Sequence, residues 1–255
     1  MLKAGLTSVT FREKTPEEVI RLAAQAGLSG IEWASHAHAH QGDIALARDI
    51  ARMTREAGLE VSSYGSYFLL GSNQDITPFL ESAKALGTDQ MRIWGGDTGS
   101  ADLTYDQRQA MIEECQRISQ KAAQYGVTLS LECHNDSITD TLSSQILCLF
   151  EVNRPNFCSY WQADLVLPLE QRLHTLRTLY ATGKLTNIHL YWYNLQKEQQ
   201  LLQVGAEYIT NWLSLLKDDS ATRYALIEFV KDGTEENFFL DAKTLLSIVD
   251  TVNHL

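Results

Sequence analysis

The stretch Leu129–Asp136 reads Leu-Ser-Leu-Glu-Cys-His-Asn-Asp, and we interpret the rest of the chain as organised around it. Apolar and polar residues alternate in it, which is typical of a β-strand with Ser130, Glu132 and His134 on one face. Polar groups at the end of a buried strand cost free energy unless they find partners or a ligand. The stretch therefore predicts a strand that ends in a functional site.

The same pattern, an apolar run that ends in a carboxylate, amide or imidazole, returns three times later in the chain. We expect the four strand ends to converge on one site. The later stretches are Tyr160–Asp164 with Gln162 and Asp164, Asn187–Tyr191 with His189, and Ala225–Phe229 with Glu228.

Helical patterns separate eight strand patterns along the chain, which implies parallel strands joined by crossovers. Eight such units in 255 residues predict a single α/β domain, a (β/α)8 TIM barrel over residues 1–255. An open sheet is the weaker alternative, because no Gly-x-Gly-x-x-Gly follows the first strand. The expected strands are Lys3–Val9, Ser29–Ala34, Leu59–Tyr64, Gln90–Trp94, Leu129–Asp136, Phe157–Gln162, Thr186–Tyr191 and Tyr224–Val230.

The composition of the chain argues against a nucleic-acid-binding protein and against a membrane protein. The formal net charge of −11 and the lack of a Lys/Arg cluster argue against a nucleic-acid partner. The four cysteines form no C-x-x-C pair and are expected to be reduced thiols. We see no signal peptide, and no apolar run approaches the roughly 20 residues of a membrane helix. We therefore expect a soluble, cytoplasmic protein without a membrane partner.

The polar residues at the four strand ends suit one kind of metal site. Two Glu, one His and a further oxygen donor make a nitrogen and oxygen ligand set, which fits Mn²⁺, Mg²⁺, Co²⁺ or Zn²⁺. Each residue could instead satisfy a separate local polar need. Four equivalent strand ends together favour the common site, since the working residues of a TIM barrel lie at the C-terminal ends of its strands.

Three motifs carry a resemblance to a known family, and the resemblance extends from Gly30–Trp33 (Gly-Ile-Glu-Trp) to the strand of Glu228. The motifs are Leu129–His134, Asn187–Leu190 (Asn-Ile-His-Leu) and Leu226–Phe229 (Leu-Ile-Glu-Phe). The chain resembles the sugar phosphate isomerase/epimerase family, the xylose isomerase-like barrels that include endonuclease IV, inosose dehydratase and the ketose 3-epimerases. The resemblance implies that Glu132, His189 and Glu228 bind one divalent metal ion, and that Glu132 and Glu228 are the catalytic acid/base pair.

The chain departs from the family pattern at two places. Gln162 stands where the family has a metal-binding Asp, and Leu165 stands where it has a His; Gln162 is the expected fourth ligand, with Asp164 as its substitute. No Arg follows His189 in the segment Tyr191 to Leu195, whereas the family's epimerases often carry one. We therefore expect a different substrate clamp on that loop.

The resemblance implies a divalent-metal-dependent sugar isomerase or epimerase that abstracts a proton next to a carbonyl and forms an enediolate. An inosose-type dehydratase and a non-catalytic carbohydrate-binding barrel remain as alternatives, while the net charge speaks against an endonuclease-type phosphodiesterase. The expected partner is a small carbohydrate or polyol, and the sequence leaves the oligomeric state open, a homo-oligomer included. The expected substrate contacts are His134, His38, Arg92, Trp94, Tyr64, Trp161 and Tyr191.

Overall fold

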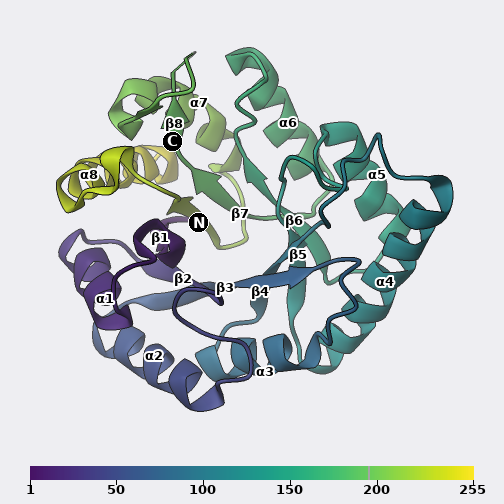
Figure 1. Cartoon of the computed structure of the whole chain (residues 1–255). Coiled ribbons are helices and arrows are strands. Elements are labelled where there is room, and N and C mark those ends of the chain that lie inside the picture. Colours follow the sequence, from purple (N-terminus) through teal and green to yellow (C-terminus); the bar gives the residue numbers. More distant parts are fainter. Residues whose placement is uncertain (195) are drawn as a thin grey trace.

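Eight parallel strands close into a barrel that is surrounded by helices (Figure 1) in the computed structural model, which describes residues 1–194 and 196–255. Around the barrel the strands follow the order β1, β10, β7, β6, β5, β4, β3 and β2. The expected TIM barrel is thereby confirmed. The strands are β1 (Leu2–Thr7), β2 (Gly30–Ala34), β3 (Glu60–Leu69), β4 (Gln90–Trp94), β5 (Thr128–Leu131), β6 (Phe157–Gln162), β7 (Leu185–Leu190) and β10 (Arg223–Ile227).

A helix follows each barrel strand, and local capping fixes where several of them begin and end. Thr15 forms a capping box with Glu18 at the start of α1, and Gly87, in the left-handed region at φ 79°, ends α3. The helices are α1 (Pro16–Gln25), α2 (Ile44–Glu56), α3 (Thr77–Leu86), α4 (Tyr105–Gln124), α5 (Leu142–Val152), α6 (Leu169–Ala181), α7 (Ala206–Leu213) and α8 (Glu235–Asn253).

Short elements lie in the connections between the barrel units. The connection after β7 carries a small antiparallel pair, β8 (Trp192–Tyr193) and β9 (Gln199–Gln200). The 3-10 helices are η1 (Ser8–Phe11), η2 (Leu202–Gly205), η3 (Ser214–Leu216) and η4 (Lys231–Gly233).

Four strands, β1, β5, β7 and β10, end earlier than their sequence pattern predicts, and the ends of β5 and β10 position site residues. β5 ends at Leu131 and β10 at Ile227, so Glu132 and Glu228 are the first residues beyond their strands. The predicted extension of the fifth strand to Asp136 is wrong, because Thr139 folds back and its hydroxyl donates a 2.6 Å hydrogen bond to the carbonyl of Glu132. The following helix, α5, begins at Leu142, with Thr141 as its N-cap.

The barrel strands are buried almost throughout, as is usual for parallel strands that helices cover. Charged side chains share this interior with the apolar core, and they gather at the C-terminal ends of the strands. All four cysteines are free thiols. Among the described residues, no helix is both long and apolar enough to cross a membrane.

Candidate metal and catalytic site

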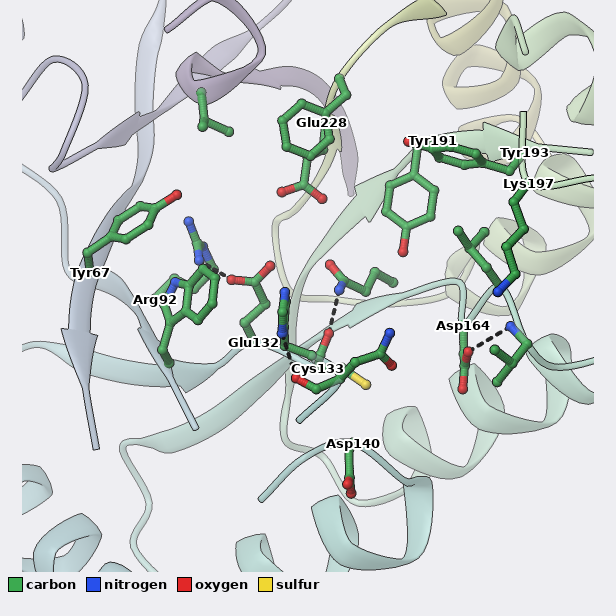
Figure 2. A pocket seen from close by; sticks show the side chains of 18 of the residues that line it. Tyr67, Arg92, Glu132, Cys133, Asp140, Asp164, Tyr191, Tyr193, Lys197 and Glu228 are labelled. Atoms are coloured by element: carbon green, nitrogen blue, oxygen red, sulfur yellow. Dashed lines mark hydrogen bonds and ion pairs between the residues drawn. The ribbon is translucent and has the colours of Figure 1, made fainter. Parts of the chain in front are cut away.

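The four predicted metal-binding residues come together at one end of the barrel. Gln162 is the last residue of β6, His189 lies in β7 beside it in register, and Glu132 and Glu228 follow β5 and β10. Glu132, Gln162 and Glu228 line a cavity of about 630 Å³. In Figure 2 the carboxylates of Glu132 and Glu228 point toward the same space from different sides.

His189 is the centre of this cluster. It is fully buried and contacts three carboxylates. Its Nδ1 atom lies 3.4 Å from Glu228 Oε2 and 4.0 Å from Glu132 Oε1, while its Nε2 atom lies 3.3 Å from Glu32 Oε1. Neither nitrogen makes a hydrogen bond of good geometry with any described residue. The ring is therefore surrounded by negative charge, and its shortest contact with a carboxylate is the 3.3 Å from Nε2 to Glu32 Oε1.

Arg92, in the middle of β4, joins two of the carboxylates. Its Nε atom donates to Glu32 Oε1 at 3.0 Å, and its Nη1 atom donates to Glu132 Oε2. Arg92, Glu32 and Glu132 are all buried, so this guanidinium compensates two carboxylates that are largely withdrawn from water. Gly65 of β3 makes room for the pair, because a Cβ atom there would lie 2.9 Å from Glu32 Oε1 and 3.0 Å from Arg92 Nη2.

The pKa values of these groups are shifted by burial and by one another. Burial raises the pKa of Glu132, and the nearby carboxylates of Glu228 and Glu32 raise it further against the lowering effect of Arg92. Burial also acts to raise the pKa of Glu228, but His189 and Arg92 outweigh it and lower the pKa. Burial would lower the pKa of His189, but Glu228 and Glu32 raise it to about 10. The pKa of Glu132 is thus raised and that of Glu228 lowered, although both are candidate catalytic carboxylates.

The cluster fits a divalent cation in composition and in charge. One ligand atom each from Glu132, His189 and Glu228 lies within 4.8 Å of the others. Together with Glu32 there are three buried carboxylates against one guanidinium, which leaves two negative charges for a cation to balance when His189 binds it as the neutral imidazole. Both ring nitrogens of His189 and the buried Oε1 atom of Gln162 have no hydrogen-bond partner among the described residues. Buried polar atoms without partners point to a ligand.

Gln162 and Asp164 differ in which side-chain oxygen is free to bind a metal ion. The Nε2 atom of Gln162 donates to the Cys133 carbonyl, which leaves its Oε1 atom as a neutral oxygen ligand. Asp164 also lines the cavity, but its Oδ1 atom accepts a 2.9 Å hydrogen bond from the backbone N–H of Val166. Among the described residues, the metal-binding cluster does not include Asp164.

Four of the seven expected substrate contacts line the cavity. Arg92, Trp94, His134 and Tyr191 do so, and the ring of His134 lies over Trp94 with centroids 4.6 Å apart. The hydroxyl of Tyr191 donates a 3.0 Å hydrogen bond to the Ala163 carbonyl.

The other three expected contacts, His38, Tyr64 and Trp161, lie outside the cavity lining. The ring nitrogens of His38 lie 3.0 Å from Ser8 Oγ and from the Lys14 carbonyl. Tyr64 donates to the Ala39 carbonyl, and the indole N–H of Trp161 donates to Thr175 on α6. All three side chains are thus held by hydrogen bonds outside the cavity.

The sequence reasoning missed Glu32 as a site residue and several residues of the cavity wall. Glu32 lies on the strand Gly30–Ala34, whose alternation places it on the same kind of inward face as Glu132, so the same pattern could have found it. Leu195, in the loop that was expected to carry a substrate clamp, lies outside the described residues. The wall residues that were not expected as site residues are Val9, Arg12, Cys133, Asn135, Asp140, Leu165, Val166, Tyr193, Lys197 and Phe229.

Comparison with known proteins agrees with this architecture. Residues 20–161 match the family model described as "Xylose isomerase-like TIM barrel". The chain belongs to this family. The match ends at the sixth strand, so the strand ends that carry His189 and Glu228 lie beyond it.

Three relatives illustrate the range of the family. A 3-dehydroshikimate dehydratase of Bacillus anthracis is 26% identical over 166 residues, which are 61% of this chain and only 59% of that enzyme. The crystal structure of the probable 3-DHS dehydratase AsbF from Bacillus anthracis has a TM-score of 0.78 at 19% identity, covering 96% of this chain and 98% of that one. A D-allulose 3-epimerase from Methylomonas sp. in complex with D-allulose has a TM-score of 0.71 at 18% identity, covering 98% and 96%. The structural matches show the shared fold.

Proposed function

We propose that the chain is an enzyme that removes a proton from the carbon next to a carbonyl group of a small polyhydroxylated substrate. The observation that carries the proposal is the placement of Glu132 and Glu228, two buried carboxylates that flank His189 and open into one cavity. Two positioned carboxylates can exchange a proton with a carbon acid from different directions. Isomerisation, epimerisation and dehydration next to a carbonyl all begin with this step.

The surroundings of the two carboxylates support different roles. Glu228 has the lowered pKa and serves as the base, because it is held ionised beside His189. Glu132 has the raised pKa and serves as the acid that returns the proton or protonates a leaving hydroxyl. Pairs of carboxyl groups whose pKa values are pushed apart are a common basis for acid and base assignments. Arg92 holds the side chain of Glu132 in place through its Nη1 atom.

Glu132, His189 and Glu228, with the amide oxygen of Gln162 as a neutral fourth donor, would hold the divalent cation. Such a cation would supply Lewis-acid polarisation of the substrate carbonyl and offset negative charge as the proton leaves. The wall residues Trp94, His134 and Tyr191 would orient the substrate within the cavity. Their aromatic rings present apolar surface and hydrogen-bonding groups side by side, which suits a polyol.

Dehydration is the second candidate outcome, and the match to a 3-dehydroshikimate dehydratase favours it. The absence of an Arg in the residues after His189 also separates the chain from the family's epimerases. In a dehydratase Glu228 takes the proton from carbon and Glu132 protonates the hydroxyl, which leaves as water. The proton on Glu228 must then pass to Glu132 or to solvent before the next turnover. An epimerase instead returns the proton to the same carbon.

The test is turnover with 3-dehydroshikimate and with D-allulose, each in the presence of Mn²⁺, Mg²⁺, Co²⁺ or Zn²⁺, with products identified by mass spectrometry and NMR. Loss of water indicates the dehydratase, and a change of configuration indicates the epimerase. Glu228→Gln should lower the rate by about 10²- to 10⁴-fold, the usual contribution of a general base. Asp140→Asn is the matched control, because Asp140 lines the cavity without contacting His189. Equal activity of Glu228→Gln and the wild type would refute the proposal.

A further inference from the structure

Glu32 is a buried carboxylate that does not line the cavity, yet it contacts the centre of the site. We propose that Glu32 is a positioning residue, which fixes the ring of His189 so that Nδ1 faces the space between Glu132 and Glu228. The inference rests on the proposed function, because it concerns the imidazole of the same site.

The two oxygens of Glu32 have separate partners. Oε1 accepts from Arg92 Nε at 3.0 Å and lies 3.3 Å from His189 Nε2. Oε2 accepts from the hydroxyls of Ser63, at 2.7 Å, and Tyr160, at 2.8 Å. Three hydrogen bonds, from Arg92, Ser63 and Tyr160, fix the position of the Glu32 carboxylate. The orientation of the His189 ring is therefore set by this carboxylate.

The two nitrogens of His189 consequently face different surroundings. Nε2 faces Glu32, and Nδ1 faces Glu228 at 3.4 Å and Glu132 at 4.0 Å. When a metal ion binds the ring, the nitrogen that faces a fixed carboxylate keeps its proton, and the other nitrogen, Nδ1, becomes the ligand. Metal-binding histidines commonly donate their second N–H to a carboxylate in this way, and loss of that carboxylate typically weakens metal binding about 10- to 100-fold.

A second contact limits the rotation of the same ring. The ring of Tyr160 meets the ring of His189 edge-on, with centroids 5.0 Å apart and an interplanar angle of 83°. Tyr160 is itself held, because its hydroxyl donates to Glu32 and accepts a 3.0 Å hydrogen bond from Asn187 Nδ2. Glu32 therefore acts on the imidazole directly through Oε1 and indirectly through Tyr160.

Two variants of Glu32 and one control test the inference on the whole chain. Glu32→Leu removes the acceptor, while Glu32→Gln keeps an oxygen toward Nε2 because the hydroxyls on the other side can accept from its amide. Tyr160→Phe is the matched control, since it removes one donor from the network and leaves the carboxylate in place. The measurements are Zn²⁺ affinity by isothermal titration calorimetry and ring ¹⁵N NMR of the Zn²⁺-loaded protein, with His189→Gln to assign the signal.

We expect the wild type to carry its ring proton on Nε2 and the metal on Nδ1. Glu32→Leu should lose about 10- to 100-fold in Zn²⁺ affinity and the protected Nε2–H signal. Glu32→Gln should keep the signal with a smaller loss of affinity, and Tyr160→Phe should stay close to the wild type. If Glu32→Leu destabilises the fold, the signal of Glu32→Gln still decides the question.

Three results would overturn the inference: a wild-type ring with the metal on Nε2, unchanged Zn²⁺ affinity in Glu32→Leu, or no Zn²⁺ binding by the wild type. None of these measurements uses a substrate. A wild type that binds Zn²⁺ through Nδ1 but turns over no carbonyl substrate would instead contradict the proposed function and leave the role of Glu32 standing.

Discussion

Metal binding by the chain should release a proton from His189. Glu228 and Glu32 raise the pKa of His189 to about 10, so the imidazole is protonated at neutral pH and Nδ1 has no free lone pair. A cation can use Nδ1 only after that proton leaves. Because pH 7 lies three pH units below this pKa, protonation should weaken the apparent affinity about 10³-fold, equivalent to about 4 kcal/mol.

The sign of the pH dependence follows from the raised pKa. Between pH 7 and pH 9 the imidazolium still predominates, so the apparent affinity for Mn²⁺ should increase about tenfold for each unit of pH. Isothermal titration calorimetry in two buffers of different ionisation enthalpy measures the released protons directly. We expect about one proton per bound Mn²⁺ at pH 7.5, and none from this source in His189→Gln. An affinity independent of pH, with no proton released, would refute the reasoning.

Three further changes have expected outcomes. Gly65→Ala should destabilise the fold by about 1–3 kcal/mol in urea unfolding, because its Cβ would lie 2.9 Å from Glu32 Oε1; an unchanged midpoint would contradict this packing. Burial raises the pKa of Asp241 from 3.8 to about 6. The free energy of unfolding should therefore fall as the pH rises from 3.8 to about 6, because the carboxyl group loses its proton more readily in the unfolded chain than in its buried position. Asp241→Asn, which keeps an acceptor for the Leu202 N–H, should therefore raise stability at pH 7 by up to about 3 kcal/mol, and thermal melts at pH 3.5 should show no gain. Gln162→Asp should tighten Mn²⁺ binding about tenfold by adding a charged oxygen ligand, and weaker binding in calorimetry would place Gln162 outside the metal site.

The barrel could be predicted because each strand–helix unit carries its own local signal. The capping box of Thr15 with Glu18 and the glycine at position 87 lie where the sequence places a helix start and a helix end. The strand ends were harder to place, because alternation describes side-chain direction and not hydrogen bonding between strands. The alternation that starts at Leu129 continues past Leu131, where the strand ends.

The limits of the site prediction have a different physical cause. Glu32 gains its importance from Arg92 and His189, which lie far from it in sequence and meet it only in the closed barrel. Trp161 could have been placed outside the cavity from its position alone, because it alternates with Gln162 and so points toward the helices. His38 lies in a loop, where no periodicity indicates the direction of a side chain.

Solvent exchange into a substrate tests the central claim, proton abstraction by the carboxylate pair, most directly. The metal-loaded protein would be incubated in D₂O with 3-dehydroshikimate or D-allulose, and NMR would follow the carbon next to the carbonyl. With the wild type and with Asp140→Asn, we predict that deuterium replaces the hydrogen on that carbon, or that this hydrogen is lost on dehydration. With Glu228→Gln we predict neither. Turnover of either compound without any exchange or cleavage at that C–H bond would contradict the account.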